Sequence, residues 1–384
     1  MPRPLAALVA ALALAGCAAV PPAAESDPLF ADQLFAAPSE PVDASRVFAA
    51  SEAMRRYIAE EIGDLPGSKG RQQALMDALR NKAKLKLEYD AAYTRNAAEA
   101  FEARTGNCLS LVIMTASLAR EMGIAVRFQS VFVEETWSRQ GDLYFSIGHV
   151  NLALGGRPPK LGTRIDDGEQ LIVDFLPPPD LKGLNWRIVD DRTILAMYMN
   201  NRAAESIADG RLDDAYWFAR EAIRQDPAFV VAQNTLGVIY QRRGHLAQAE
   251  RVLARALDLE PRNTRILTNL ANVYEAQGRR GLAQALQERL ARLEPDPPFA
   301  FFNRGLAAAR AGDWRRAREL FAKEVERAPY YHEFHFWLAV ALANLGEPEG
   351  ARRHLALAME NSTTRRDHDL YAAKLQRIGS ARLH

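Results

Sequence analysis

The stretch Arg104-Thr105-Gly106-Asn107-Cys108 stands directly before a run of apolar residues at helical spacing, and this run ends at Gly123. The pattern predicts a helix over about residues 107–122 with Gly123 as its C-cap. Cys108 then lies in the first turn of the helix. The partial positive charge of the unpaired backbone amides there favours the thiolate over the thiol, and the thiolate is the form that a nucleophilic cysteine needs.

The sequence on either side of this helix predicts the rest of one α+β domain. Residues 46–103 have mostly helical spacing of apolar residues. Beyond Gly123, segments rich in Val, Ile, Phe and Tyr predict strands over residues 124–133, 143–154 and 170–176. The helix that carries Cys108 therefore leads into an antiparallel sheet.

A partner for Cys108 follows from the positions of the histidines. Of seven histidines, only His149 lies outside the C-terminal half of the chain. An antiparallel register that pairs Leu154 with Glu169 would also place His149 opposite Asp174, with Cβ atoms about 5 Å apart. A carboxylate at that distance orients an imidazole. The candidate catalytic residues are therefore Cys108, His149 and Asp174.

The chain resembles the transglutaminase-like superfamily over about residues 90–180. The resemblance rests on a cysteine on a helix, a histidine on a strand, an aspartate on the next strand and the Arg104–Cys108 motif. The resemblance implies a papain-like fold in which Cys108 attacks a carbonyl, His149 moves the proton and Asp174 holds the ring. The backbone amide of Cys108 and one unassigned donor would stabilise the oxyanion. The chain departs from the family at Asn151, where an aromatic residue is common. A papain-like peptidase of another family shares the same residue order and remains an alternative.

The C-terminal half has a period of 34 residues. Prolines recur at Pro227, Pro261, Pro295 and Pro329, and alanines recur at Ala215, Ala249, Ala283, Ala317 and Ala351. This is the period of the tetratricopeptide repeat, which the sequence resembles. About five units over residues 196–363 should stack into an all-α solenoid whose concave groove binds a peptide or protein partner. The first unit is degenerate at Arg202, Ala203 and Ser206, so we expect it to pack on the preceding domain.

The N-terminus has the features of an export signal. Residues 1–17 combine a basic start, a short apolar run and a small-residue end. The ending Leu14-Ala15-Gly16-Cys17 resembles the lipobox of bacterial lipoproteins, which implies lipidation of Cys17 and, with Ala18 next, the periplasmic side of the outer membrane. An ordinary cleaved signal is the alternative. Residues 18–45 are rich in Pro, Ala and acidic residues, which is typical of a flexible tether. The apolar pairs Leu29-Phe30 and Leu34-Phe35 could dock on the folded part, so the whole tether need not be free.

Composition limits the function classes. Hydrophobic residues make up 48% and charged residues 25% of the 384-residue chain, as in globular proteins. The net charge of +1 gives no sign of a nucleic-acid partner. Two cysteines exclude a disulfide framework. His332 and His335 lack zinc-protease spacing and a third ligand, so neither a metal nor a cofactor is expected.

These observations predict a transglutaminase-like domain over residues 46–195, repeats over 196–363 and a tail over 364–384. The expected activity is hydrolysis of a peptide or amide bond through a Cys108 thioester, with transfer to an amine as a less favoured outcome. The rival hypothesis is an inactive fold in which the repeats act as a binding scaffold of the cell envelope.

Overall fold

The helix that carries Cys108 lies at the centre of the N-terminal core in the computed structural model, which describes residues 29–63, 67–80, 85, 87–140, 143–155, 170–175 and 185–380. This helix, α4 (Cys108–Glu121), begins where the Asn107 side chain accepts a hydrogen bond from the Ser110 amide. It ends at Gly123, whose φ of 66° is in the left-handed region, as predicted. Twelve of its residues are buried, so α4 is the central element of the domain.

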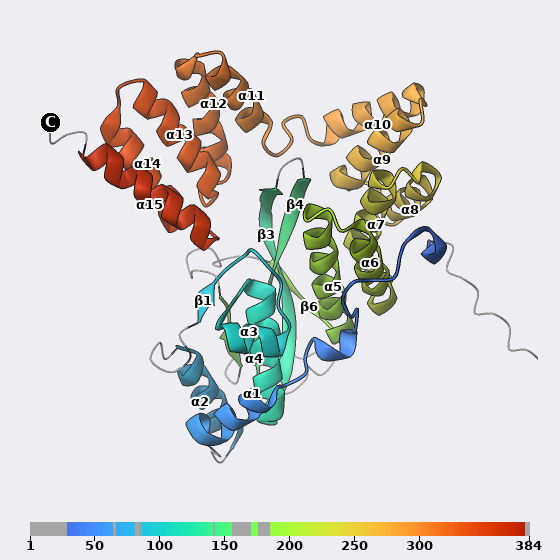
Figure 1. The fold of residues 1–384 in the computed structure, drawn as a ribbon, viewed down its shortest axis with the longest axis vertical. Coiled ribbons are helices and arrows are strands. Elements are labelled where there is room, and N and C mark those ends of the chain that lie inside the picture. Colours follow the sequence, from blue (N-terminus) through green and yellow to red (C-terminus); the bar gives the residue numbers. More distant parts are fainter. Residues whose placement is uncertain are drawn as a thin grey trace, which may run out of the picture.

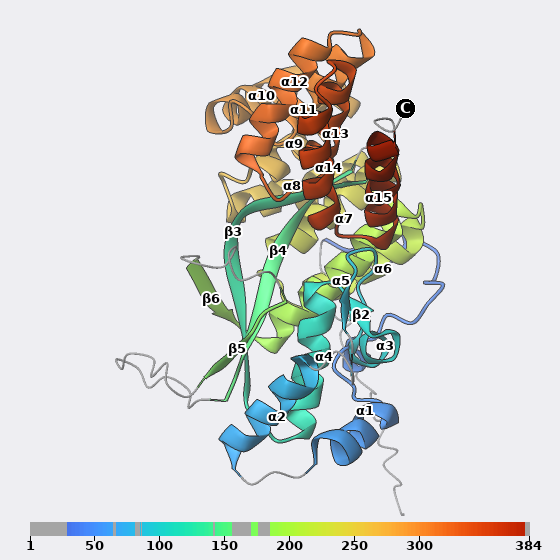
Figure 2. The same ribbon diagram turned by 90° about the vertical axis from the view of Figure 1, so that its left-hand side faces the viewer.

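A four-stranded sheet in the order β5-β4-β3-β6 packs against α4 (Figures 1 and 2). All neighbouring strands are antiparallel, and β3 and β4 form a long hairpin with a register shift between Val131 and Thr136. Phe128, Leu152 and Val173 lie on the face that joins the core. The strands are β3 (Val126–Gln140), β4 (Leu143–Leu154), β5 (Leu171–Val173) and β6 (Asn185–Val189).

Short elements complete this domain at the N-terminal side of α4. Two short strands pair in parallel and lead directly into the first turn of α4. The elements are η1 (Asp32–Leu34), η2 (Ala44–Arg46), α1 (Glu52–Tyr57), the π-helix η3 (Ile58–Ile62), α2 (Ser68–Arg80), β1 (Glu88–Tyr89), α3 (Ala97–Ala103) and β2 (Thr105–Gly106). The predicted fold class, a helix with an antiparallel sheet followed by helical repeats, is confirmed.

Five helix hairpins and a final helix form the C-terminal half (Figure 1). The recurring alanines at 215, 249, 283, 317 and 351 are at most 2% exposed, because the paired helices of each hairpin approach closely there. The hairpins are α5 (Asp191–Ala208) with α6 (Leu212–Gln225), α7 (Val230–Arg242) with α8 (Leu246–Leu259), α9 (Thr264–Ala276) with α10 (Arg280–Leu293), α11 (Ala300–Arg310) with α12 (Trp314–Arg327), and α13 (His332–Asn344) with α14 (Pro348–Glu360).

The stack of hairpins is interrupted between α10 and α11, which differs from the expected continuous solenoid. The segment between them contains Pro297 and Pro298, and Phe299 has a left-handed φ of 64°. One apolar core extends from the N-terminal domain into the first three hairpins, and a second core is formed around Phe302, Phe321 and Phe334. The repeats therefore form two blocks, which we call the N-terminal block (α5–α10) and the C-terminal block (α11–α15).

Two segments that the sequence assigned to a tether and a tail are folded. Residues 29–45 are packed rather than free, since Phe35 stacks on Tyr216 with ring centroids 4.0 Å apart and Trp217 donates to the Ala36 carbonyl. The tether is therefore not free over residues 29–45, where the two apolar pairs are packed on the folded part. The predicted tail contains α15 (Arg365–Ser380), which packs on α14 and caps the C-terminal block.

The predictions for residues 1–28, which include Cys17 and the export signal, lie outside the described residues. The same holds for residues 381–384. Among the helices that the structure describes, none is long and apolar enough to cross a membrane.

Candidate active site

Cys108 is the first residue of α4 and is 6% exposed. Because the first amides of a helix have no partner within the helix, they point their hydrogens toward the region of the Cys108 side chain. The Asn107 side chain occupies only the Ser110 amide. The Asn107 cap therefore leaves the Cys108 amide to a partner from outside the helix.

His149 and Asp174, the two other predicted residues, are in direct contact. His149 Nε2 lies 2.9 Å from each oxygen of the Asp174 carboxylate. The side chains of both residues are less than 10% exposed, at 4% and 8%. The strands β4 and β5 therefore bring the imidazole and the carboxylate together, away from water.

The register that was predicted for these two strands is wrong by two residues. Leu154 pairs with Leu171 and Leu152 pairs with Val173, so Asp174 is a diagonal neighbour of His149 rather than its direct partner. Side chains on a strand alternate between faces with a period of two, so a two-residue shift leaves every side chain on the face that was expected. Diagonal neighbours are about 7–8 Å apart at Cα, which an imidazole can span.

His149 also forms a hydrogen bond with Cys108. Since Nε2 is used by Asp174, the ring nitrogen left for the sulfur is Nδ1. Burial lowers the pKa of His149, but the hydrogen bond to Asp174 and the hydrogen bond and charge of Cys108 outweigh burial and raise this pKa to about 9. His149 is therefore protonated at neutral pH, and an imidazolium beside the sulfur stabilises the thiolate.

Asn151 is a residue of the site that sequence reasoning left unexplained. Its Nδ2 donates a hydrogen bond of 2.8 Å to Asp174 Oδ2. Asn151 thus fixes the carboxylate from β4, two residues along the strand from His149. The i, i+2 spacing from His149 was the available sequence signal, because such residues share a strand face.

The sequence motif before Cys108 is explained by close packing at the start of α4. A Cβ atom added at Gly106 would lie 2.6 Å from the Ser110 Cβ, so only glycine fits there. Asn107 Nδ2 donates to Thr94 Oγ1 at 2.8 Å, and Ser110 Oγ accepts from the Arg95 amide at 2.8 Å. The loop at Thr94 and Arg95 is thereby fixed to the first turn that carries Cys108.

The repeats touch the same region at two points. In the N-terminal block, Glu205 Oε1 accepts from the Thr94 amide at 2.7 Å, while Ala203 and Ser206 are fully buried. In the C-terminal block, the Thr363 carbonyl accepts from the Ala91 amide at 3.0 Å, just beyond β1. The degenerate positions of the first repeat therefore serve its packing on the N-terminal domain.

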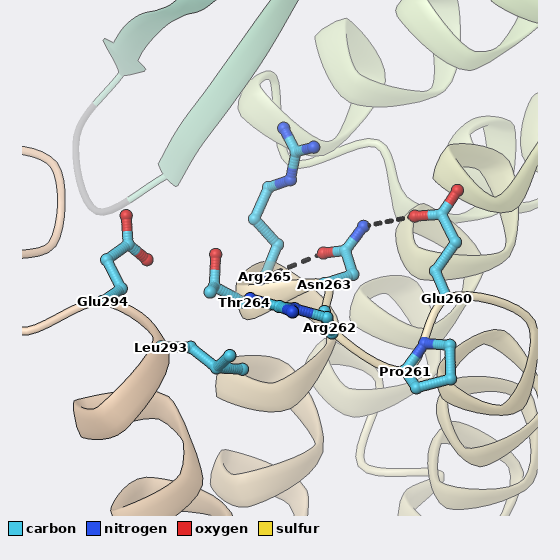
Figure 3. Close-up of a pocket in the computed structure, with 8 residues that line it drawn as sticks. All are labelled: Glu260, Pro261, Arg262, Asn263, Thr264, Arg265, Leu293 and Glu294. Carbon is cyan, nitrogen blue, oxygen red and sulfur yellow. Dashed lines mark hydrogen bonds between the residues drawn. The ribbon is translucent and has the colours of Figure 1, made fainter.

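Other parts of the described structure offer no comparable site. No group of three or more metal-ligating side chains occurs among the described residues. His332 Nδ1 contacts the Tyr371 hydroxyl at 2.7 Å, and His335 Nδ1 contacts His354 Nδ1 at 3.0 Å, so both histidines take part in repeat packing. An open hollow at the end of the N-terminal block, lined by residues 260–265, Leu293 and Glu294, lies in the repeats rather than beside Cys108 (Figure 3).

Comparison with known proteins agrees with this architecture. Residues 56–154 match the Transglutaminase-like superfamily, and residues 242–300 and 302–364 match the Tetratricopeptide repeat. The chain therefore contains a transglutaminase-like domain followed by tetratricopeptide repeats, as predicted. The first match includes Cys108 and His149 but ends before Asp174.

Among solved structures, three similar proteins illustrate the range of similarity. MamA is 18% identical over 43% of this chain and 91% of its own, with a TM-score of 0.25. YrrB, described as a TPR protein with an unusual peptide-binding site, is 22% identical over 47% and 92%, with a TM-score of 0.25. PilF of Pseudomonas aeruginosa is 21% identical over 50% and 88%, with a TM-score of 0.30. Curated proteins gave no match.

Proposed function

We propose that this chain is an exported, lipid-anchored cysteine enzyme that cleaves a peptide or amide bond through a thioester on Cys108. The observation that carries the proposal is the contact of His149 with both Cys108 and Asp174 at the N-terminus of α4. A cysteine beside a protonated histidine, with a carboxylate orienting the ring, is the arrangement that nucleophilic acyl transfer requires.

The reaction follows from the charges of these groups. The Cys108 thiolate adds to the carbonyl carbon, and the electron pair of the C=O bond moves to the oxygen. His149 then donates its Nδ1 proton to the leaving amine as the C–N bond breaks, which leaves a thioester. Water attacks the thioester while His149 accepts a proton from it, and cleavage of the C–S bond restores the thiolate. An amine in place of water would give transfer rather than hydrolysis.

The tetratricopeptide repeats support binding of a protein partner. On the first helices of adjacent hairpins, Asn269 donates to Asn234 at 2.9 Å and Thr235 donates to Asn200 at 2.7 Å. A row of amide and hydroxyl groups offers both donors and acceptors to the backbone of an extended peptide. We therefore propose that the partner is a peptide or protein segment.

The enzymatic part of the proposal is tested by alkylation of Cys108 with iodoacetamide at pH 6.5, followed by intact mass. The full chain carries Cys17→Ser, so that Cys108 is its only thiol. At this pH about 1% of an ordinary thiol is ionised. We expect alkylation at least tenfold faster than for the same chain unfolded in urea, and a loss of this advantage in His149→Ala.

Asp174→Ala should reduce the rate less than His149→Ala, because Asp174 acts through the ring. His368→Ala, an exposed histidine in α15, is the matched control and should leave the rate unchanged. Slow alkylation that none of these changes affects would contradict the enzymatic proposal and favour the binding-scaffold hypothesis.

Lipid anchoring is a separate part of the proposal and rests on the sequence around Cys17. Expression of the natural chain in a bacterial host should give a protein that partitions into detergent micelles and incorporates labelled fatty acid. Cys17→Ser should abolish both properties, whereas Cys108→Ser should abolish neither. Partitioning that is equal for the natural chain and Cys17→Ser would exclude lipidation as the anchor.

A further inference from the structure

The Cys108 amide has a partner that the sequence did not suggest. Tyr89, on β1, pairs in parallel with Gly106 on β2, two residues before Cys108. The Glu88 amide donates to the Arg104 carbonyl at 2.9 Å, and the Asp90 amide donates to the Gly106 carbonyl at 3.1 Å. These two bonds fix the backbone of Tyr89 beside the strand that enters α4.

The side chain of Tyr89 reaches the nucleophile from this position. Its hydroxyl accepts a hydrogen bond from the backbone of Cys108 and also lies close enough to feel the charge of the sulfur. The residue as a whole is 39% exposed, so one side of it faces solvent while the hydroxyl end lies at Cys108. The hydroxyl oxygen therefore occupies the place where the Cys108 amide would meet the carbonyl oxygen of a substrate.

Two other polar side chains near Cys108 are each held by a hydrogen bond within the protein. Asn151 Nδ2 donates to Asp174, and Asn107 Nδ2 donates to Thr94. Burial, and then the charge of Cys108, raise the pKa of Tyr89 well above its usual value of 10.0, so the hydroxyl keeps its proton and can donate it in a hydrogen bond.

We propose that Tyr89 completes the oxyanion site, its hydroxyl donating a hydrogen bond to the oxygen of the tetrahedral intermediate beside the Cys108 amide. The inference rests on the proposed function of Cys108 as a nucleophile. As the thiolate adds to the carbonyl carbon, negative charge develops on the carbonyl oxygen. The proton stays on Tyr89, so no bond forms or breaks at this residue. A substrate oxygen that enters beside the Cys108 amide displaces the hydroxyl from this amide, and the hydroxyl then donates to that oxygen.

Two reagents separate this role from a general effect on the thiolate. Iodoacetamide alkylates the sulfur by direct displacement, in which no oxyanion forms. The ester p-nitrophenyl acetate acylates the sulfur through a tetrahedral oxyanion and releases p-nitrophenolate, which is measured by its absorbance. The ratio of the acylation rate to the alkylation rate therefore reports on oxyanion stabilisation alone.

The test compares Tyr89→Phe with the full chain, both carrying Cys17→Ser. Removal of one oxyanion donor lowers rates by about 100-fold or more in known enzymes. We expect Tyr89→Phe to slow acylation by at least tenfold. This effect is smaller than 100-fold because an activated ester depends less on the oxyanion donor. Alkylation should change by less than about twofold. Tyr93→Phe is the matched control, since Tyr93 is 51% exposed on the same loop, and it should change neither rate.

The inference would be overturned if the ratio of acylation to alkylation rates were equal in Tyr89→Phe and in the parent chain. Faster acylation in Tyr89→Phe would also overturn it, because the hydroxyl would then obstruct entry of the substrate oxygen. A parallel fall of both rates would also overturn it, because it would assign Tyr89 to positioning the helix. Failure of the proposed function is distinguishable: the parent chain would then be neither alkylated nor acylated faster than the urea-unfolded chain, and both proposals would fall.

Discussion

The charge on His149 determines what Cys108 can do at neutral pH. A protonated imidazole beside the sulfur favours a thiolate, and in the reaction that we propose it supplies the proton that the leaving amine needs. Asp174 makes this possible, because a buried imidazole without a carboxylate would lose its proton. Asn151 in turn holds the carboxylate in place. Three successive polar contacts thus join Asn151 to Asp174, Asp174 to His149, and His149 to Cys108 in the first turn of α4.

The raised pKa of His149 makes the stability of the protein depend on pH. The folded-state pKa of about 9 exceeds the ordinary value of 6.5, so the folded protein binds this proton more tightly than the unfolded chain. The resulting stabilisation is complete below about pH 6.5 and disappears as the pH rises to about 9. We expect His149→Gln to lose on the order of 2 kcal/mol more stability at pH 6 than at pH 9.5.

Urea unfolding at the two pH values measures this difference. His368→Gln, which alters an exposed histidine of α15, should give the same loss at both values. If the loss of stability in His149→Gln did not vary with pH, His149 would be neutral in the folded protein. No imidazolium would then lie beside the sulfur of Cys108.

At the scale of the elements, the extended segment of residues 29–40 packs on the first repeats. It lies along α6 and the end of α7 (Figure 1), where the Ala31 amide donates to the Tyr216 hydroxyl at 3.0 Å and the Tyr240 hydroxyl donates to the Leu29 carbonyl at 2.9 Å. Both tyrosines are fully buried beneath it. The segment therefore covers part of the first two hairpins.

Phe35 is the main apolar contact of this segment. It is 8% exposed and stacks on Tyr216, so Phe35→Ala should cost about 3–5 kcal/mol, the usual range for a buried phenylalanine. We expect trypsin, followed by mass spectrometry, to cleave at Arg46 or Arg220 faster in Phe35→Ala than in the parent chain. Gln33→Ala, an exposed change in the same segment, should cleave at the parent rate. Equal rates for Phe35→Ala would show that the segment is held by its polar contacts alone.

At the scale of the whole molecule, the two apolar cores divide the chain into two units. The first core joins the N-terminal domain to the N-terminal block, and the second core lies within the C-terminal block. The break at Pro297 and Pro298 separates them along the chain, and the bond from the Ala91 amide to the Thr363 carbonyl links them across space. In Figure 1 the far end of the β3–β4 hairpin lies between the two blocks.

This division predicts two transitions in differential scanning calorimetry. Leu253→Ala removes a fully buried side chain from the first core, and Phe321→Ala removes one from the second core. Because each change costs about 2–5 kcal/mol locally, each should lower the midpoint of one transition by several degrees and leave the other in place. A single transition that both substitutions lower would show that the blocks unfold as one cooperative unit.

Local signals in the sequence were sufficient to predict the main elements. The glycine at 123 and the spacing of apolar residues predicted α4 within one or two residues of its observed bounds. The 34-residue period predicted the hairpins, because each repeat has to bury the same small residue against its partner helix. The short strands β1, β2 and β6 were missed, since two to five residues carry too little periodicity to distinguish a strand from a loop.

The sequence by itself determined the kinds of element, their order and the residue types that carry the chemistry, because helix caps, strand alternation and repeat period act over a few neighbouring residues. Only the tertiary structure decided the diagonal contact of His149 with Asp174, the approach of Tyr89 to the Cys108 amide and the packing of residues 29–45 on the first repeats. These contacts join residues that are 19 to 211 positions apart in the chain. They depend on how the packed core sets the register and closes the loops, and no local pattern records that outcome.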